Sequence, residues 1–166
     1  MINEIKVIFD KFPERSKAES WSPSTDWTSA VKRSLCDLAA SKNLASCASI
    51  DNADYSEWLY DVVWLETQEG AKDTTNVIDC VLVCESEWGN VGHIRDDFQK
   101  LLLAKADYRL MIFQANSLDS FNKILLQLKE QIFLFKKSVI SDRYLFVGYI
   151  INEERFEYQE FVYANI

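Results

Sequence analysis

Two carboxylates, Glu85 and Glu87, stand at the end of a mostly apolar stretch, residues 77–87. Successive side chains of a β-strand point to opposite faces, so both acids would share one face with Val81 and Val83. Crowded or buried carboxylates cost free energy unless a cation or hydrogen bonds compensate for their charge. The pair therefore predicts a divalent-cation site at the strand end, and the competing interpretation is a solvated strand end, the commoner fate of acids.

A third acid, Asp61, falls within residues 57–66, which predict a strand that is apolar apart from its acids. A polar turn at residues 67–75 would fold this strand back on residues 77–87 as an antiparallel hairpin. Adjacent strands lie about 4.8 Å apart, so Asp61 and Glu85 could reach one ion. Mg²⁺ prefers oxygen ligands and takes one or two protein carboxylates. The alternative is that Asp61 pairs with an arginine at a sheet edge.

Hydrophobic periodicity gives the elements that would position these acids. Helical spacing covers residues 2–12, ended by Pro13, and residues 13–23 are typical of a loop. The remaining expected elements are a helix from Ser24 to about residue 42, a short strand at 44–50, a helix at 91–104, a strand at 107–114, a helix at 117–135, and a final hairpin of strands at 144–151 and 156–163.

Composition excludes some classes of protein. The chain has 166 residues, enough for a single domain with a sizeable core. Its net charge of -8 argues against coating nucleic acid by charge alone, although an acidic site can be offset by bound metal. Four cysteines without a C-x-x-C pair, and one histidine, disfavour a zinc site and indicate reduced thiols in a cytoplasmic protein. Neither a signal peptide nor a membrane span is expected.

The order helix, three strands, helix, strand, with Asp61 on the second strand and E-S-E at 85–87 on the third, resembles the PD-(D/E)XK nuclease superfamily. The resemblance covers residues 24–114 and implies a restriction-endonuclease-like mixed sheet flanked by helices, with the C-terminal helix and hairpin as an extension. It also implies that Asp61 and Glu85 bind Mg²⁺ or Mn²⁺. Glu87 stands where the family usually has lysine, and Lys100 on the following helix is offered for that role.

The expected function is therefore a divalent-metal-dependent nuclease that hydrolyses phosphodiester bonds of DNA. Catalytic residues would be Asp61, Glu85, Glu87 and Lys100, with the three acids holding metal and water. The missing E-x-K lysine and the net charge favour an alternative, a catalytically inactive nuclease-fold binding or regulatory subunit. A different α/β fold whose acids bind a basic partner is a third hypothesis. A homo-oligomer or a protein partner is left open.

Overall fold

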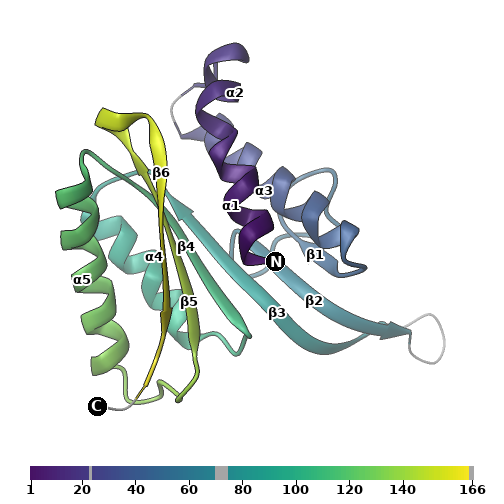
Figure 1. Ribbon diagram of the computed structural model, residues 1–166. Helices are drawn as coiled ribbons and strands as arrows, with labels where there is room; N and C mark the ends of the chain where they lie inside the picture. The colour runs from purple at the N-terminus through teal and green to yellow at the C-terminus, as the bar shows by residue number, and fades with distance from the viewer. Residues whose placement is uncertain (23, 70–74, 165–166) are drawn as a thin grey trace.

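The computed structural model describes residues 1–22, 24–69 and 75–164, and is an α/β protein built on one mixed sheet (Figure 1). The elements are α1 (Ile2–Asp10), α2 (Phe12–Ala18), α3 (Thr25–Ser41), β1 (Ala45–Cys47), β2 (Val62–Glu69), β3 (Thr75–Glu87), α4 (Val91–Leu103), β4 (Tyr108–Ala115), α5 (Leu118–Leu134), β5 (Arg143–Ile150), the short 3-10 helix η1 (Ile151–Glu153) and β6 (Arg155–Val162).

The six strands lie in the sheet in the same order as in the chain. β1, β2 and β3 pair antiparallel, β3, β4 and β5 pair parallel, and β6 returns antiparallel to β5. The parallel pairs are joined by α4 and α5, as parallel strands require a crossover connection. The carboxyl ends of β3, β4 and β5 consequently meet at one end of the sheet.

Helices cover both faces of the sheet, with α4 and α5 on one side and α1, α2 and α3 on the other (Figure 1). Beneath α4 and α5 the core includes Val83, Phe98 and Phe113. Beneath α1 and α3 it includes Phe9, Trp64 and Ile112. Both faces are buried in β4 and in the second half of β3, and both segments are correspondingly apolar, the pattern expected of a covered parallel sheet.

The first correction to the sequence analysis concerns the N-terminus. The helix expected at residues 2–12 ends at Asp10, and a second helix, α2, occupies most of the expected loop at residues 13–23. Pro13 lies in the first turn of α2, where its missing N–H would have had no helical partner anyway. Phe9 and Phe12 flank the bend between the helices and are both buried, which holds α1 and α2 against the sheet.

The strand expected at residues 57–66 is displaced. It begins at Val62 and runs to Glu69, so Asp61 precedes the strand instead of lying in its middle. Leu59 is 77 % exposed, so the residues before Asp61 are not part of a buried strand. The antiparallel hairpin of β2 and β3 is confirmed, with β3 beginning two residues earlier than expected and β2 extending three residues further toward the turn. The centre of the expected turn, residues 70–74, lies outside the described residues.

The sequence analysis assigned the side chains in the middle of β3 to the wrong faces of the sheet. Trp64 pairs with Leu82 while Leu65 pairs with Cys80, so Val81 is an extra residue in a bulge. Cys80 therefore packs beneath α4 and α5, and Val81 packs on the opposite face, the reverse of strict alternation. Beyond the bulge, Glu85 and Glu87 pair with Met111 and Phe113, so the backbone alternation between the two acids is as expected.

The other elements match the expected ones within one or two residues, apart from the first strand. That strand, expected at 44–50, is only the three residues of β1. Ser117 caps α5, its hydroxyl accepting a hydrogen bond from the backbone N–H of Ser120. None of the helices in the described part of the chain combines the length and apolarity needed to cross a membrane.

A close approach at Gly148 gives a test of the packing between β5 and α5. A Cβ at this position would collide with the ring of Phe121, which stacks on Phe113. Gly148→Ala should therefore lower the free energy of unfolding by about 1–3 kcal/mol, measured by urea denaturation. In a Phe121→Leu background the same substitution should cost clearly less, because the smaller side chain can move aside. Equal costs in both backgrounds would contradict the packing described.

Candidate functional site

Asp61 lies immediately before β2 and is held by neighbouring groups. Its Oδ2 accepts hydrogen bonds from the backbone N–H of Ser86, at 2.9 Å, and from the Ser86 hydroxyl, at 2.8 Å. Its Oδ1 lies 3.1 Å from Nζ of Lys32 on α3. Ser86 thus fixes Asp61 to the end of β3, and Lys32 fixes it to α3.

Glu85 is the buried acid at the end of β3, with only 3 % of its surface exposed. Its Oε1 has no hydrogen-bond partner among the described residues, although Nζ of Lys100 lies 3.3 Å away. Burial, and then the nearby negative charge of Asp61, raise the pKa of Glu85 to about 8, against the opposing effect of Lys100. The carboxyl is consequently mostly protonated at neutral pH.

Lys100 on α4 reaches Glu85, although an ideal helix directs it away from the buried face. Its ammonium also lies 2.7 Å from Asp97, one turn earlier on α4. The long aliphatic stem allows the charged end to reach back over the helix, as lysine side chains commonly do. Burial lowers the pKa of Lys100, but its contacts with Asp97 and Glu85 outweigh that effect and raise it.

Glu87 is separate from this group. Its Oε1 accepts a hydrogen bond of 2.5 Å from the backbone N–H of Gly89, so it closes the turn after β3. No three acids, cysteines or histidines among the described residues are placed to hold a metal ion. The expected cluster of Asp61, Glu85 and Glu87 is therefore not formed. Alternation along β3 gave the right face for Glu87, but the strand ends there and its carboxylate turns to the backbone.

Lys32 is a site residue that the sequence analysis missed. It is only 7 % exposed, and its ammonium contacts Glu57 at 2.5 Å and the hydroxyl of Ser49 at 2.9 Å, in addition to Asp61. Burial lowers its pKa, but the two carboxylates outweigh this and raise it, so Lys32 is a buried cation. The sequence did contain one indication that Lys32 is buried. Lys32 lies one turn before Cys36, on the side of α3 that faces the sheet.

Asp61 and Glu85 can be tested as ligands for a divalent cation. Both supply oxygen, and Mg²⁺ commonly takes one or two carboxylates and keeps several waters. The unpartnered Oε1 of Glu85 provides a buried acceptor without a hydrogen-bond donor. The oxygens of Asp61 already accept bonds, yet a carboxylate has about four lone-pair sites. Asp61 meets Lys32 on the α3 side of the sheet and Glu85 meets Lys100 on the α4 side, so one ion of the Mg²⁺ or Mn²⁺ type would have to bridge the two acids around the end of β3, without Glu87.

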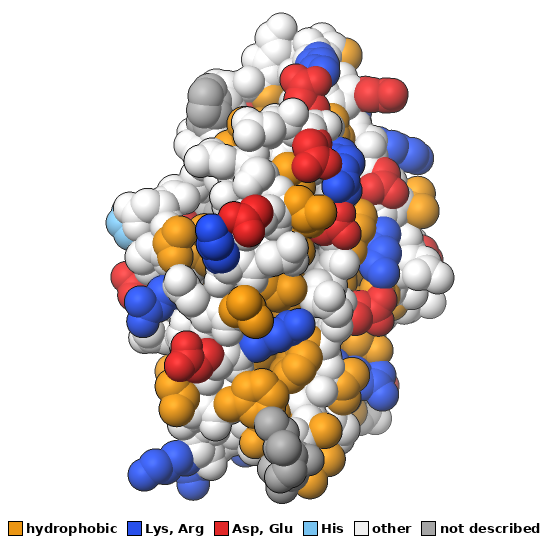
Figure 2. Space-filling model, turned by 60° about the vertical axis from the view of Figure 1, so that its left-hand side comes forward, with side chains coloured by type: hydrophobic (Ala, Val, Ile, Leu, Met, Phe, Trp, Pro, Cys, Tyr) orange, Lys and Arg blue, Asp and Glu red, His pale blue; other side chains and the backbone are white. Residues whose placement is uncertain are grey.

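Comparison of the chain with protein families, with curated proteins and with solved structures gives no match. The surface adds one constraint on partners. On the face in Figure 2, acidic and basic side chains are interspersed, and no broad basic area is present there. Any nucleic acid bound on that face would need contacts other than a continuous positive surface.

The raised pKa of Glu85 predicts how stability depends on pH. Folding raises this pKa from the ordinary 4.5 to about 8, so the folded protein binds a proton that the unfolded chain releases between these values. The free energy of unfolding should therefore fall as pH rises through this window, by of the order of 4 kcal/mol in total. Glu85→Gln keeps the shape without the charge and should remove most of this fall.

Urea denaturation across the same pH range measures the effect, as the difference between the variant and the wild type at each pH. Glu130→Gln is the matched control, because Glu130 is an exposed acid on α5. The control should follow the wild type throughout. A constant difference between Glu85→Gln and the wild type would show that Glu85 is ionised in the folded protein at every pH tested.

Proposed function

We propose that this protein is a divalent-metal-dependent nuclease of the restriction-endonuclease-like type, acting on phosphodiester bonds of DNA. The observation that carries the proposal is the buried carboxyl group of Glu85, whose Oε1 accepts no hydrogen bond from a described residue, with the Lys100 ammonium 3.3 Å away and a pKa raised in part by the charge of Asp61. A strongly shifted acid with specific charged neighbours is a recognised sign of a functional site. The order of elements from α3 to β4 supports the same assignment.

In this proposal, Asp61 and Glu85 hold Mg²⁺ or Mn²⁺. The bound ion would polarise the phosphodiester and make water nucleophilic at neutral pH. Lys100 provides a positive charge at the same carboxylate, where it can neutralise charge that develops on a phosphate or orient a water. Because Glu85 must lose its proton to bind a cation, metal affinity should increase as pH approaches 8.

A second candidate function is favoured by Lys32. Its ammonium already neutralises Asp61 and Glu57, which leaves less need for a metal ion at Asp61. A buried lysine in this place is consistent with a nuclease-fold subunit that has lost catalysis and serves as a binding or regulatory partner. Metal binding and strand cleavage, measured separately, distinguish the two functions.

The first experiment needs no substrate. A ligand that binds only the folded state adds about 2.7 kcal/mol of stability at a hundredfold excess over Kd. For a chain of 166 residues, this corresponds to a rise in Tm of roughly 5–10 °C. Millimolar Mn²⁺ at about pH 8 should therefore raise the Tm of the wild type above its value in EDTA. Asp61→Asn and Glu85→Gln should respond much less, because each removes one ligand charge.

The Glu130→Gln variant should respond to Mn²⁺ as the wild type does, which separates the site from general binding to surface acids. If the Tm of the wild type is the same in Mn²⁺ and in EDTA, the metal site is absent and the nuclease proposal fails with it.

The second experiment measures cleavage of end-labelled single- and double-stranded DNA, with RNA as a comparison, in Mn²⁺ or Mg²⁺. Loss of a metal ligand or of its supporting groups typically costs 10–100-fold or more, so Glu85→Gln should abolish measurable cleavage. Lys100→Met should slow cleavage while the Mn²⁺ response of the Tm is retained, since lysine does not ligate the ion. A wild type that binds Mn²⁺ but cleaves none of these substrates would favour the regulatory subunit.

A further inference from the structure

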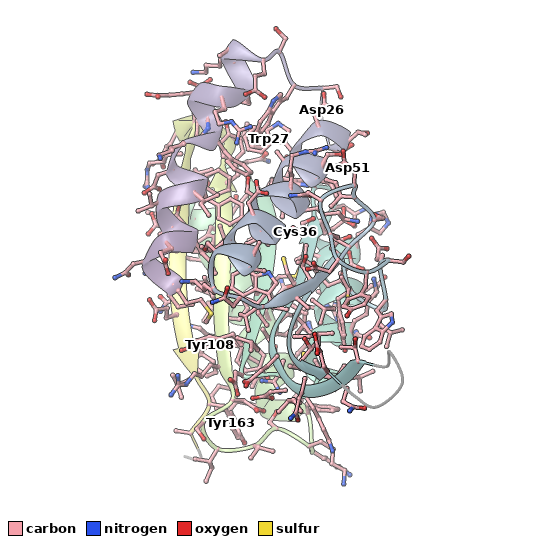
Figure 3. All side chains as sticks on the ribbon, turned by 90° about the vertical axis from the view of Figure 1, so that its right-hand side faces the viewer. Asp26, Trp27, Cys36, Asp51, Tyr108 and Tyr163 are labelled. Atoms are coloured by element: carbon pink, nitrogen blue, oxygen red, sulfur yellow. The ribbon has the colours of Figure 1, made fainter. Side chains whose placement is uncertain are left out.

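A cleft of about 700 Å³ opens beside the proposed metal site, at the carboxyl ends of the parallel strands. Its walls come from the N-terminal end of α3, the end of β3 and the ends of β4 and β5. The residues that line it include Trp21, Trp27, Trp88, Tyr149, Glu87 and Gln114. Figure 3 shows Trp27 at the opposite end of the molecule from Tyr108, the first residue of β4. Crevices at such strand ends are common ligand sites in α/β proteins.

The apolar part of the cleft is almost entirely aromatic. The ring of Trp27 lies 4.8 Å from that of Tyr149 and 5.4 Å from those of Trp21 and Trp88. Trp88 is held by a hydrogen bond from its Nε1 to the hydroxyl of Thr28, at 3.1 Å. All four rings are only partly buried, so they can offer surface to a planar ligand. Aromatic side chains of this kind stack on unpaired nucleic-acid bases irrespective of sequence.

The polar lining of the cleft includes two acceptor groups, on Glu87 and Gln114, in addition to the hydroxyls of Ser24, Thr28 and Ser86. Glu87 uses Oε1 to accept from the backbone of Gly89, and no described residue donates to its Oε2. Gln114 donates its amide N–H to the carbonyl of Trp88, which leaves its own oxygen as an acceptor. Neither lysine nor arginine lines the cleft in the described part of the chain, so a phosphate would find no counter-charge there. A ligand that offers N–H donors is favoured instead.

Guanine is the common base that matches a carboxylate in this position. Its pairing edge has two adjacent N–H donors, the ring N1–H and the 2-amino group, which can both bond to one carboxylate. Adenine and cytosine present one amino donor next to an acceptor nitrogen, and uracil and thymine present one N–H between two carbonyl oxygens. An acceptor beside a carboxylate is repelled, so these bases should bind less tightly.

The cleft also adjoins the acid site through Ser86. This residue lines the cleft, and its hydroxyl and backbone N–H both bond to Asp61. We propose that the aromatic cleft binds a guanine base that is unstacked from its strand, with Glu87 reading its N–H edge. The inference rests on the proposed function in one respect, namely that the base belongs to a DNA strand and lies next to the cleaved bond. Guanine binding itself requires no metal.

Isothermal titration calorimetry with nucleoside monophosphates in EDTA tests the inference. GMP should bind at least tenfold more tightly than AMP, CMP or UMP. IMP, which lacks the 2-amino group, should lie between GMP and the others. Glu87→Gln replaces one acceptor oxygen by a donor, and should lower the affinity for GMP about tenfold and remove the difference between GMP and IMP. The Glu130→Gln control should bind GMP as the wild type does.

Equal affinity for the four monophosphates, no measurable binding, or an unchanged preference for GMP in Glu87→Gln would each overturn the guanine site. A melting curve of Glu87→Gln checks its fold, and Trp88→Phe, which keeps an aromatic ring, provides a second variant that should weaken all monophosphates alike. Selective GMP binding together with an unchanged Tm in Mn²⁺ would support the guanine site and contradict the nuclease proposal. A Tm that rises in Mn²⁺ without selective GMP binding would contradict the guanine site alone.

Discussion

The carboxyl group of Glu85, buried at the end of β3 and subject to the negative charge of Asp61, is the constraint on which the arrangement around it depends. Two carboxylates close together in a low-dielectric setting cannot both ionise cheaply. Each is given a cation from a different helix layer, Lys32 on α3 for Asp61 and Lys100 on α4 for Glu85. The compensation is unequal, since Lys32 is buried while Lys100 is half-exposed, and Glu85 retains a raised pKa.

This inequality explains why the site is suited to an added cation. Lys32 has fixed partners in Asp61, Glu57 and Ser49, so its position is set by several bonds at once. Lys100 divides its charge between Glu85 and Asp97, with the shorter distance to Asp97. Glu85 is therefore the acid with the least compensation. Its Oε1 lacks a hydrogen bond among the described residues, which is a cost to the fold, and costs of this kind are commonly retained where they serve a ligand.

The aromatic cleft and the acid pair are two separate environments joined by one residue. Ser86 has its hydroxyl on the α3 side of the sheet, where it meets both Asp61 and the cleft. Glu85 faces α4 instead, because adjacent residues of a strand point to opposite faces. Glu87, which alternation would place with Glu85, lies where the strand stops and belongs to the cleft. Within three residues at the end of β3, Glu85 thus lies on the side of α4 and Glu87 lies in the aromatic cleft.

The sequence by itself determined the α/β class, the hairpin of β2 and β3, the crossover helices and the two-sided burial of the second half of β3, because these follow from local periodicity and apolar runs. It also indicated Asp61, Glu85 and Lys100 as candidate residues. Only the tertiary structure decided the start of β2, the bulge at Val81 and the partners of Lys32. A bulge depends on pairing between strands, and a buried ion pair depends on segments far apart in the chain, so neither leaves a periodic trace in one sequence.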